Sequence, residues 1–169
     1  MKRLSRSQTG KKITKTTLGG PLKYTILILG LLSSLNLLAD TTANIRKGVM
    51  LYGYDPVSYF SSSKPVQGKV EIKAVVNGLT YQFATEENKK EFLAHTTKYE
   101  PQYEGWCATA VAGGYKNDID PENYKITDGK LYLFYKGWKG DAKKDWVKSE
   151  PEFVKKADTN WPQVKTSKE

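Results

Sequence analysis

The sequence predicts a compact single domain of the α+β class, in which antiparallel β-hairpins pack with short helices. The first observation is a pair of dipeptides, Asn77-Gly78 and Asp128-Gly129, each lying between two runs of strand-forming residues. Such dipeptides are the strongest short-range hairpin signal, because a tight hairpin turn needs positive φ at its central positions. The second observation is that helical segments follow both hairpins. Hairpins separated by short helices are typical of an α+β domain and not of a parallel, doubly wound sheet.

The first hairpin is predicted from two adjacent segments, 69–76 and 79–84. Apolar residues alternate with polar ones from Val70 to Val76, which predicts that these apolar side chains share one face. A helix over 86–99 is expected next, because Thr85 can cap its N-terminus and acidic residues occupy its first turn.

Two neighbouring side chains of this helix, Phe92 and Leu93, are predicted to face the core. His95 comes near the end of the helix, where the helix dipole favours a cation, and a surface position is expected for it.

The second hairpin is expected around Asp128-Gly129, between "YKIT" and "KLYLFYK". Asp120-Pro121 precedes it and indicates a turn or a helix start. A short helix after the hairpin should present Trp146 and Val147 to the core. We detect no internal repeat in the sequence.

The last helix is expected to begin at a capping box, in which Ser149 and Glu152 satisfy each other's backbone N–H groups. Trp161-Pro162 is expected to end it, because proline cannot continue the hydrogen-bond ladder.

The N-terminal segment has the pattern of an export signal. A basic region ends at Lys23, and an apolar run over 24–39 follows. This run is too short and too interrupted by polar residues for a membrane span, which needs about 20 apolar residues. A signal peptide cleaved after Ala39 or Ala43 is therefore predicted, and the protein would be periplasmic or secreted with no stable membrane span after cleavage. The alternative is an uncleaved N-terminal membrane anchor.

These observations divide the chain into four segments. They are a signal peptide (1–39), a linker (40–49), the folded domain (50–164) and a flexible tail (165–169).

The charge of the chain is concentrated in the leader. The whole sequence has 27 basic and 18 acidic residues, but seven basic residues and no acidic one lie in 1–39. The remainder has 20 basic and 18 acidic residues and lacks a basic stripe with interleaved aromatics. Nucleic acid is therefore not expected as a partner.

Four motifs, in this order, resemble the exported branch of the YHS-domain family. The resemblance covers roughly residues 48–164 and rests on "GYDPVSYF", "NGLTYQFATEENKKEFLAHTTKYEPQYEGWCATAV", "DGKLYLFY" and "KKADTNWPQV". It implies a compact α+β module, and metal handling is proposed for the wider family. Some members of this branch carry selenocysteine at the position of Cys107.

The metal function of the short YHS domains has weak support in this sequence. Those domains place a cysteine just after the Y-x-F of the second strand and another four residues on, and Ala84 and Asn88 stand there in this chain. The remaining soft ligands are Cys107, His95 and Met50. Zinc sites gather several Cys or His ligands, so no tight zinc site is expected, and weak copper binding is the most that this set predicts.

Cys107 is the candidate for a reactive group, because it is the only cysteine of the chain. The following "ATAVA" favours a helix that Gly113-Gly114 would stop, which places Cys107 in its first turn. Unpaired N–H groups there stabilise a thiolate, so a lowered pKa is expected. A buried packing role is the alternative, since free cysteine is among the most buried residue types.

Two functions from different classes follow. The first is an exported thiol-redox or soft-metal protein that uses Cys107, with an outside thiol reductant as partner. The second is a non-catalytic module that binds a small ligand or a protein, in which Cys107 is structural. An acid–base enzyme has the least support, because the chain has one histidine and no G-x-S-x-G or phosphate-loop motif.

Overall fold

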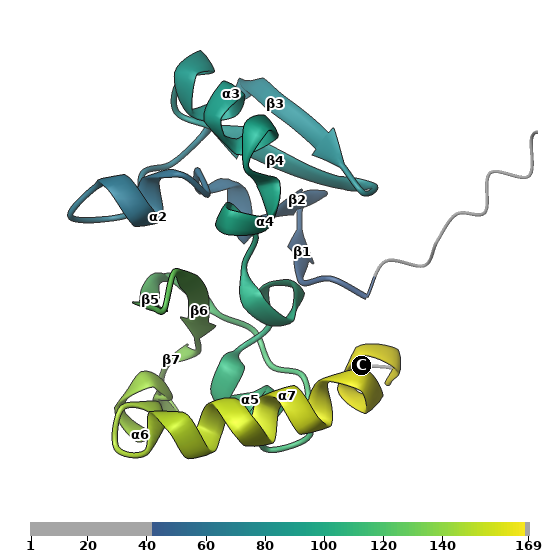
Figure 1. Ribbon diagram of the computed structural model, residues 1–169, viewed down its shortest axis with the longest axis vertical. Coiled ribbons are helices and arrows are strands. Elements are labelled where there is room, and N and C mark those ends of the chain that lie inside the picture. The colour runs from purple at the N-terminus through teal and green to yellow at the C-terminus, as the bar shows by residue number, and fades with distance from the viewer. Residues whose placement is uncertain (1–41, 168–169) are drawn as a thin grey trace, which may run out of the picture. The chain divides into compact units, whose positions relative to one another are not determined.

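The computed structural model describes residues 42–167, in which short antiparallel hairpins alternate with short helices (Figure 1). This arrangement is the α+β fold that the sequence predicts. The predicted signal peptide and the last two residues of the predicted tail lie outside the described residues. Within 42–167, no helix combines the length and the apolar character that crossing a bilayer requires.

The first half of the described chain contains two hairpins and several short helices. Its elements are β1 (Ile45–Arg46), β2 (Val49–Met50), the 3₁₀ helix η1 (Leu51–Gly53), α2 (Ser58–Ser61), β3 (Lys69–Val76), β4 (Leu79–Phe83), α3 (Glu86–Ala94) and α4 (Thr96–Tyr99).

The second half has the same kinds of element and ends in the longest helix. Its elements are the 3₁₀ helix η2 (Gln102–Gly105), α5 (Ala108–Ala112), β5 (Asp120–Thr127), β6 (Lys130–Phe134), β7 (Lys136–Gly137), β8 (Gly140–Asp141), α6 (Lys143–Trp146) and α7 (Glu150–Thr166).

The two main hairpins turn where the sequence predicts. Asn77 and Asp128 both have positive φ, 52° and 51°, and a glycine follows each of them. The expected face of the first strand is only partly formed, because the pairing shifts register between Lys69 and Lys73 and leaves Val70 72% exposed. A bulge of this kind rotates the side chains that precede it away from the buried face.

The same register recurs in both hairpins, and it shows a structural repeat that the sequence analysis missed. In each hairpin, a strand of eight residues pairs with one of five across a two-residue turn. The register shift between Asp120 and Tyr124 in the second hairpin corresponds to the shift between Lys69 and Lys73 in the first. We call residues 50–94 the first repeat and residues 102–146 the second repeat.

The segment before each hairpin repeats as well. η1 and η2 both end at a buried glycine in the left-handed region, Gly53 with φ 85° and Gly105 with φ 84°. In the first repeat the Asp55 N–H then donates to the Val66 carbonyl at 2.9 Å. In the second repeat the Cys107 N–H donates to the Asn117 carbonyl at 3.1 Å. Asp55 and Cys107 therefore occupy equivalent positions.

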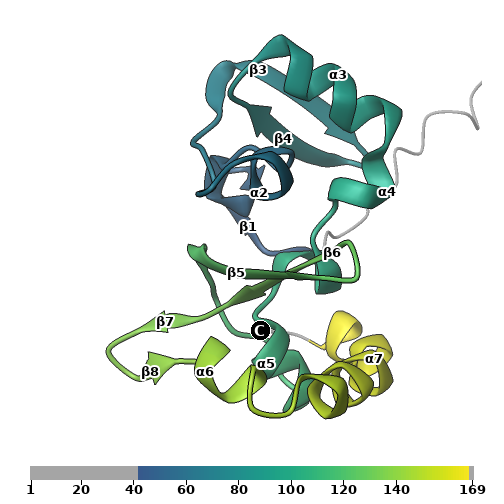
Figure 2. The same ribbon diagram turned by 60° about the vertical axis from the view of Figure 1, so that its left-hand side comes forward.

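In each repeat a helix contributes one aromatic side chain that packs on the hairpin. Figure 2 shows α3 beside the β3–β4 hairpin. Phe92 of α3 lies with its ring centroid 4.7 Å from that of Tyr81 and 5.3 Å from that of Phe83. The matching centroid distances from Trp146 of α6 are 5.1 Å to the Tyr132 ring and 5.3 Å to the Phe134 ring. Phe92 and Trp146 are both fully buried.

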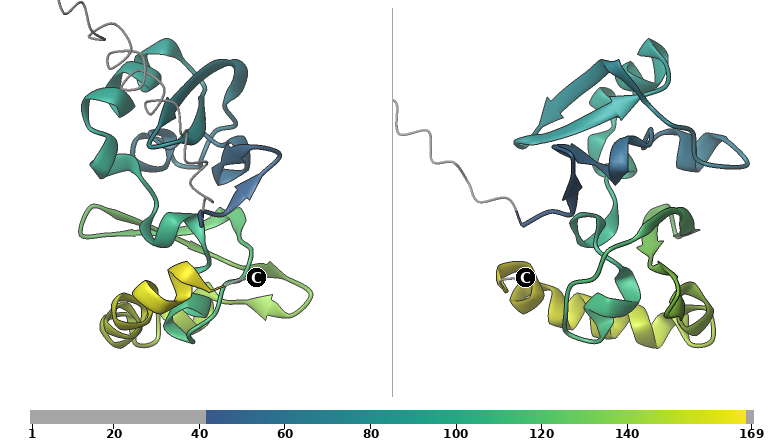
Figure 3. Two further views of the ribbon diagram at one scale, coloured as in Figure 1. Left: turned by 90° about the vertical axis from the view of Figure 1, so that its right-hand side faces the viewer. Right: turned by 180° about the vertical axis from the view of Figure 1, so that it is seen from behind.

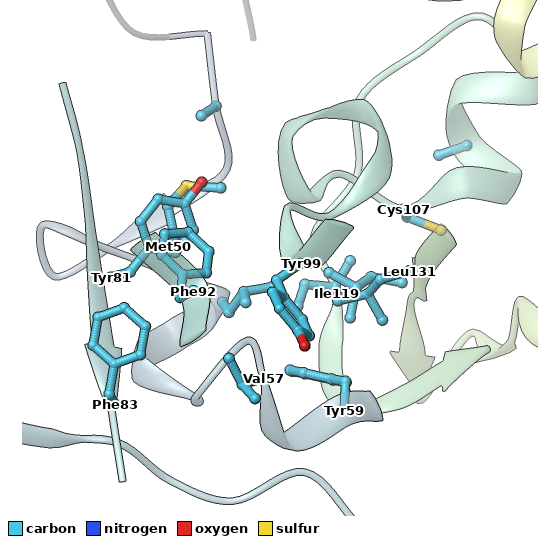
Figure 4. Packing of buried hydrophobic residues seen from close by; sticks show 14 residues of the cluster. Met50, Val57, Tyr59, Tyr81, Phe83, Phe92, Tyr99, Cys107, Ile119 and Leu131 are labelled. Atoms are coloured by element: carbon cyan, nitrogen blue, oxygen red, sulfur yellow. The ribbon is translucent and has the colours of Figure 1, made fainter. Parts of the chain in front are cut away.

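Two hydrophobic clusters fill the interior. The first includes Met50, Tyr81 and Phe92 from the first repeat, together with Cys107 and Leu131 from the second (Figure 4). The second cluster lies between the second repeat and α7, which packs against α5 (Figure 3). Because the first cluster takes side chains from both repeats, the repeats share one core.

The segment expected as a linker over 40–49 packs with the domain in the part that the structure describes. Residues 45–50 form the β1–β2 hairpin, and Ala43 and Asn44 are buried beside it. The Asn44 N–H donates to the Glu104 carbonyl at 3.0 Å, which fixes this segment against η2. These contacts with distant residues make the segment part of the domain.

The expected helix over 86–99 begins as predicted but divides at His95. Thr85 caps α3, and its Oγ1 accepts the Asn88 N–H at 3.1 Å. Phe92 is buried as predicted, whereas Leu93 is 50% exposed. Neighbouring residues of an α-helix project about 100° apart, so the face that places Phe92 in the core directs Leu93 away from it. In the same way Trp146 is buried and Val147 is 53% exposed.

The last helix differs from the prediction at both ends. Ser149 is the N-cap residue, but its side chain makes no capping bond, and its carbonyl accepts the Glu152 N–H instead. Pro162 lies inside α7, which continues to Thr166. The buried Val164 anchors the final turn, so packing compensates for the hydrogen bond that proline removes. Asp120-Pro121 begins β5 and forms no helix, but Asp120 Oδ1 accepts the Glu122 N–H at 2.9 Å, which is the bond of an Asx turn at the start of the strand.

Candidate functional site

Cys107 is the N-cap residue of α5 and not, as the sequence predicts, a residue of its first turn. Its carbonyl accepts the Val111 N–H at 3.0 Å, which starts the helix. The residue is only 1% exposed and belongs to the first hydrophobic cluster.

The sulfur of Cys107 faces a set of backbone donors. The Tyr135 N–H donates to Sγ at an N–S distance of 3.3 Å. The N–H groups of Ala110 and Thr109 at the start of α5 make no capping bond to Sγ, although they favour negative charge on it. Burial raises the pKa of the thiol above its ordinary value, and these three N–H groups offset only part of this effect. The expected lowering of the pKa is therefore wrong, because the sequence could not show how completely the thiol is removed from water.

A pocket of about 400 Å³ reaches Cys107 and is partly open to solvent. It is lined by α5, the loop that follows it, the end of β6, the turn between β7 and β8, and α6. The lining residues are Cys107, Thr109, Ala110, Tyr115, Asn117, Tyr135, Lys139, Gly140, Asp141, Ala142, Lys144, Asp145 and Lys148. The thiol is therefore covered by the protein on most sides but borders a cavity that a small molecule can enter.

The rim of this pocket carries charged side chains of both signs. Lys139, Lys144 and Lys148 contribute three positive charges, and Lys148 Nζ pairs with Asp145 Oδ1 at 2.7 Å. The carboxylate of Asp141 is held within the pocket lining, because it accepts hydrogen bonds from Asn123 Nδ2 at 2.8 Å and from the Lys143 N–H.

Partial burial raises the pKa of Asp141, but these two hydrogen bonds and the neighbouring lysine charges hold it below its ordinary value. Asp141 is thus an anion at neutral pH. The rim as a whole has one more positive than negative charge.

Asp55 forms the equivalent site of the first repeat. Its carboxylate is fully buried and accepts the Val57 N–H at 2.9 Å and the Ala84 N–H at 2.8 Å. Asn88 Nδ2 donates to the same carboxylate at 2.7 Å. Ala84 through its backbone N–H and Asn88 through its side-chain amide therefore hold a carboxylate. We call each set of backbone donors a cradle.

The two cradles differ in what lies over them. In the first repeat α3 begins directly after β4, and the side chain of Asn88 covers the carboxylate. In the second repeat the β7–β8 hairpin is inserted between β6 and α6. This insertion contributes Lys139, Gly140 and Asp141 to the pocket, so the Cys107 cradle is open where the Asp55 cradle is covered.

The three soft metal ligands named from the sequence do not meet. Met50 is buried beside Tyr81 and Phe92, whereas Cys107 lies at the far end of the same cluster near Leu131 (Figure 4). His95 is exposed at the end of α3, where its Nδ1 lies 3.2 Å from Glu91 Oε1. Among residues 42–167, no three His, Cys, Asp or Glu side chains gather in a group that could hold a metal ion.

An exposed aromatic residue adjoins the pocket and was missed in the sequence. Trp138 lies at the tip of the β7–β8 hairpin and is 90% exposed. The Tyr135 ring lies against this hairpin, because its hydroxyl accepts the Lys139 N–H at 3.4 Å and Gly137 leaves no side chain in its way. The sequence signal was the aromatic residue between two glycines in "KGWKGD".

Comparison with known proteins adds no relative to this description. No family model matches the chain, and neither a curated protein nor a solved structure matches it. The functional argument therefore rests on the residues of the chain and on the geometry of the Cys107 pocket.

Proposed function

We propose that the protein is an exported thiol-redox protein in which Cys107 reacts with small oxidants that enter the pocket. The observation that carries this proposal is the pocket of about 400 Å³ that has Cys107 in its lining, with the Tyr135 N–H donating to the sulfur. Backbone donors stabilise negative charge on sulfur or on an oxygen attached to it. The resemblance to the exported YHS family supports the same role, because some of its members carry selenocysteine at this position.

The proposed reaction uses a hydroperoxide as oxidant. The Cys107 thiol loses its proton, and the sulfur attacks one oxygen of the O–O bond. That bond breaks, the sulfur takes one oxygen, and the remaining fragment leaves as an alcohol after taking up a proton. Cys107 is oxidised by two electrons to a sulfenic acid, and the hydroperoxide is reduced by two.

Return to the thiol needs two thiols from outside, because the chain has no second cysteine. The first thiol displaces water from the sulfenic acid and forms a mixed disulfide with Cys107. The second attacks the sulfur of the first thiol, which releases Cys107 as a thiol and the two outside thiols as a disulfide. The raised pKa of Cys107 makes the first step slow at neutral pH, so the proposed protein responds to oxidant and is not a rapid peroxidase.

A protein dithiol with an acidic face is the proposed reductant. The segment 136–148 carries five lysines and two aspartates, whereas the other residues of 42–167 balance at 14 basic and 14 acidic. Trp138 projects from this segment beside the pocket, and exposed tryptophans are frequent anchors of protein interfaces. Charge complementarity would guide an acidic partner to the rim of the pocket.

The size of the thiol reagent tests this proposal. Folded protein should react with iodoacetamide and with hydrogen peroxide, but not with a maleimide carried on a large polymer. Urea-unfolded protein should react with all three, and Cys107→Ser should react with none. A folded protein that reacts with no reagent until it is unfolded contradicts the redox proposal.

A non-catalytic binding module is the second candidate. It is favoured by the 1% exposure of Cys107, which is typical of a packing residue. In that case ligands of the pocket would bind equally to the wild-type protein and to Cys107→Ser, and the thiol would stay unreactive in the folded state.

Export itself remains a proposal for the leader. We expect mass spectrometry of the exported protein to show cleavage after Ala39 or Ala43. An intact N-terminus that stays with the membrane through a high-salt wash would favour the membrane-anchored alternative.

A further inference from the structure

The two cradles use equivalent backbone donors for different side chains. In the first repeat, the N–H two residues after Asp55 and the N–H directly after β4 each bind one carboxylate oxygen. In the second repeat, the corresponding N–H groups are those of Thr109 and Tyr135. The Tyr135 N–H donates to the sulfur, whereas the Thr109 N–H makes no capping bond to it. The first cradle thus shows which chemical group this arrangement accommodates, namely a buried carboxyl group with two oxygens.

A thiol uses these donors poorly. Sulfur is a weak hydrogen-bond acceptor, so the Tyr135 N–H, 3.3 Å from Sγ, makes a weaker bond than the Ala84 N–H makes to the Asp55 oxygen. Adding oxygen to the sulfur changes this. A sulfenate carries one oxygen on the sulfur and a sulfinate carries two, so the side chain of a cysteine sulfinate has the charge and the branching of an aspartate.

The two cradles differ in the space beside them. In the first repeat Asp55 is fully buried and Asn88 Nδ2 donates to its carboxylate. In the second repeat the inserted β7–β8 hairpin leaves the pocket there, and Cys107 is one of its lining residues. An oxidant can therefore approach the sulfur from the pocket, and the oxygen that it leaves stays next to the donors.

We propose that the Cys107 cradle is a built oxidation site, in which Thr109 and Tyr135 N–H groups hold the oxidised, anionic sulfur as the first cradle holds Asp55. This inference rests on the proposed function and adds a second, more oxidised product, a sulfinic acid that outside thiols do not reduce. One hydroperoxide converts the thiol to a sulfenic acid and is reduced to an alcohol, and a second converts the sulfenic acid to a sulfinic acid in the same way. Each step gives the sulfur one oxygen and removes two electrons from it. Loss of the acidic proton to solvent yields the anion.

Aspartate at position 107 tests the cradle without any oxidation. We expect Cys107→Asp to unfold at a midpoint about 2–4 °C above that of Cys107→Asn at neutral pH. The amide has a similar shape, but its NH₂ group must face one of the N–H donors. The difference should disappear as the pH falls through the pKa of the new carboxylate, below about 4, where the proton removes the charge. Asp55→Asn in the first cradle is the matched control. It should unfold at a lower midpoint than wild type, just as Cys107→Asn should unfold at a lower midpoint than Cys107→Asp.

The oxidised protein provides the second measurement. Hydrogen peroxide should add one and then two oxygen atoms to the intact mass, all at Cys107, and the product should unfold at a higher temperature than the reduced protein. Cys107→Asp that is less stable than Cys107→Asn overturns the inference, and so does an oxidised protein that unfolds at a lower temperature than the reduced one. If the folded protein gains no oxygen, the proposed function fails and this inference fails with it, whatever the stability of Cys107→Asp.

Discussion

The two repeats share one backbone frame and differ in the side chain at its centre. The first repeat places a carboxylate in the cradle, and the N–H groups of Val57 and Ala84 and the side-chain amide of Asn88 all donate to it. The second repeat places a thiol in the equivalent cradle and inserts a hairpin beside it, which leaves a pocket. The same fold therefore buries a carboxylate with three donors in one copy and, in the other, buries a thiol that lines a pocket.

The largest expected effect concerns the aromatic residue that covers each hairpin. Trp146→Ala and Phe92→Ala should each lower the free energy of unfolding by about 3–5 kcal/mol, because both side chains are fully buried against two aromatic rings. Val147→Ala and Leu93→Ala are the matched controls and should change it by less than about 1 kcal/mol, since these neighbours are half exposed. Urea denaturation measures all four. If Phe92→Ala and Leu93→Ala, or Trp146→Ala and Val147→Ala, lowered the free energy of unfolding equally, the equivalence of the two repeats would be contradicted.

The next effect separates the two cradles. Asp55→Ala should lower the free energy of unfolding by about 2–4 kcal/mol, because it leaves the Ala84 N–H and the Asn88 amide buried without their acceptor. Cys107→Ala removes a weaker acceptor and should cost about half as much or less. Glu71→Ala, at an exposed position of β3, serves as control for the loss of a carboxylate. If Cys107→Ala and Asp55→Ala lowered the free energy of unfolding equally, the thiol would contribute as much to stability as the carboxylate.

A smaller effect follows from the raised pKa of Cys107. The rate of iodoacetamide alkylation should titrate at a higher pH in folded protein than in unfolded protein, because burial opposes the thiolate. The unfolded chain releases the thiol proton at lower pH than the folded chain does. The thiol therefore contributes stability that is present below its unfolded pKa of about 8.5 and is lost as the pH rises toward the folded value.

The measurement for this linkage is urea denaturation as the pH is raised above neutrality, for wild type and Cys107→Ser. Wild type should lose stability relative to the variant. Buried tyrosines such as Tyr59 and Tyr103, whose pKa burial also raises, affect both proteins alike and cancel in the difference. A folded protein that titrates below the unfolded one would restore the lowered pKa that the sequence suggested.

The smallest effect is expected for metal. Reduced protein titrated with zinc should show no stoichiometric site in the submicromolar range, because Cys107, His95 and Met50 lie in separate places. His95→Ala should leave weak zinc or copper binding almost unchanged. Cys107→Ser should abolish that weak binding. A tight site that survives both substitutions would show that other ligands assemble in solution.

Much of the first repeat could be predicted from local sequence. Asn77-Gly78 fixes a hairpin turn because glycine and asparagine tolerate positive φ, and Thr85 caps α3 because its hydroxyl reaches the Asn88 N–H three residues on. The repeat itself also left a signal, since "NGLTYQF" and "DGKLYLF" share the pattern of turn, tyrosine and phenylalanine. Few other positions match, so the common backbone is visible only in the pairing of the strands.

The sequence by itself determined the α+β class, both hairpin turns and the burial of Phe92 and Trp146, because these depend on residues close together in the chain. Tertiary structure alone decided the environment of Cys107. Its donor Tyr135 comes from the end of another hairpin, and the walls of its pocket come from a third one and from α6. Local pattern predicts N–H groups near a helix start, but it does not report how much water the surrounding elements exclude. That exclusion raises the pKa of the thiol, and the inserted hairpin keeps one path to it open.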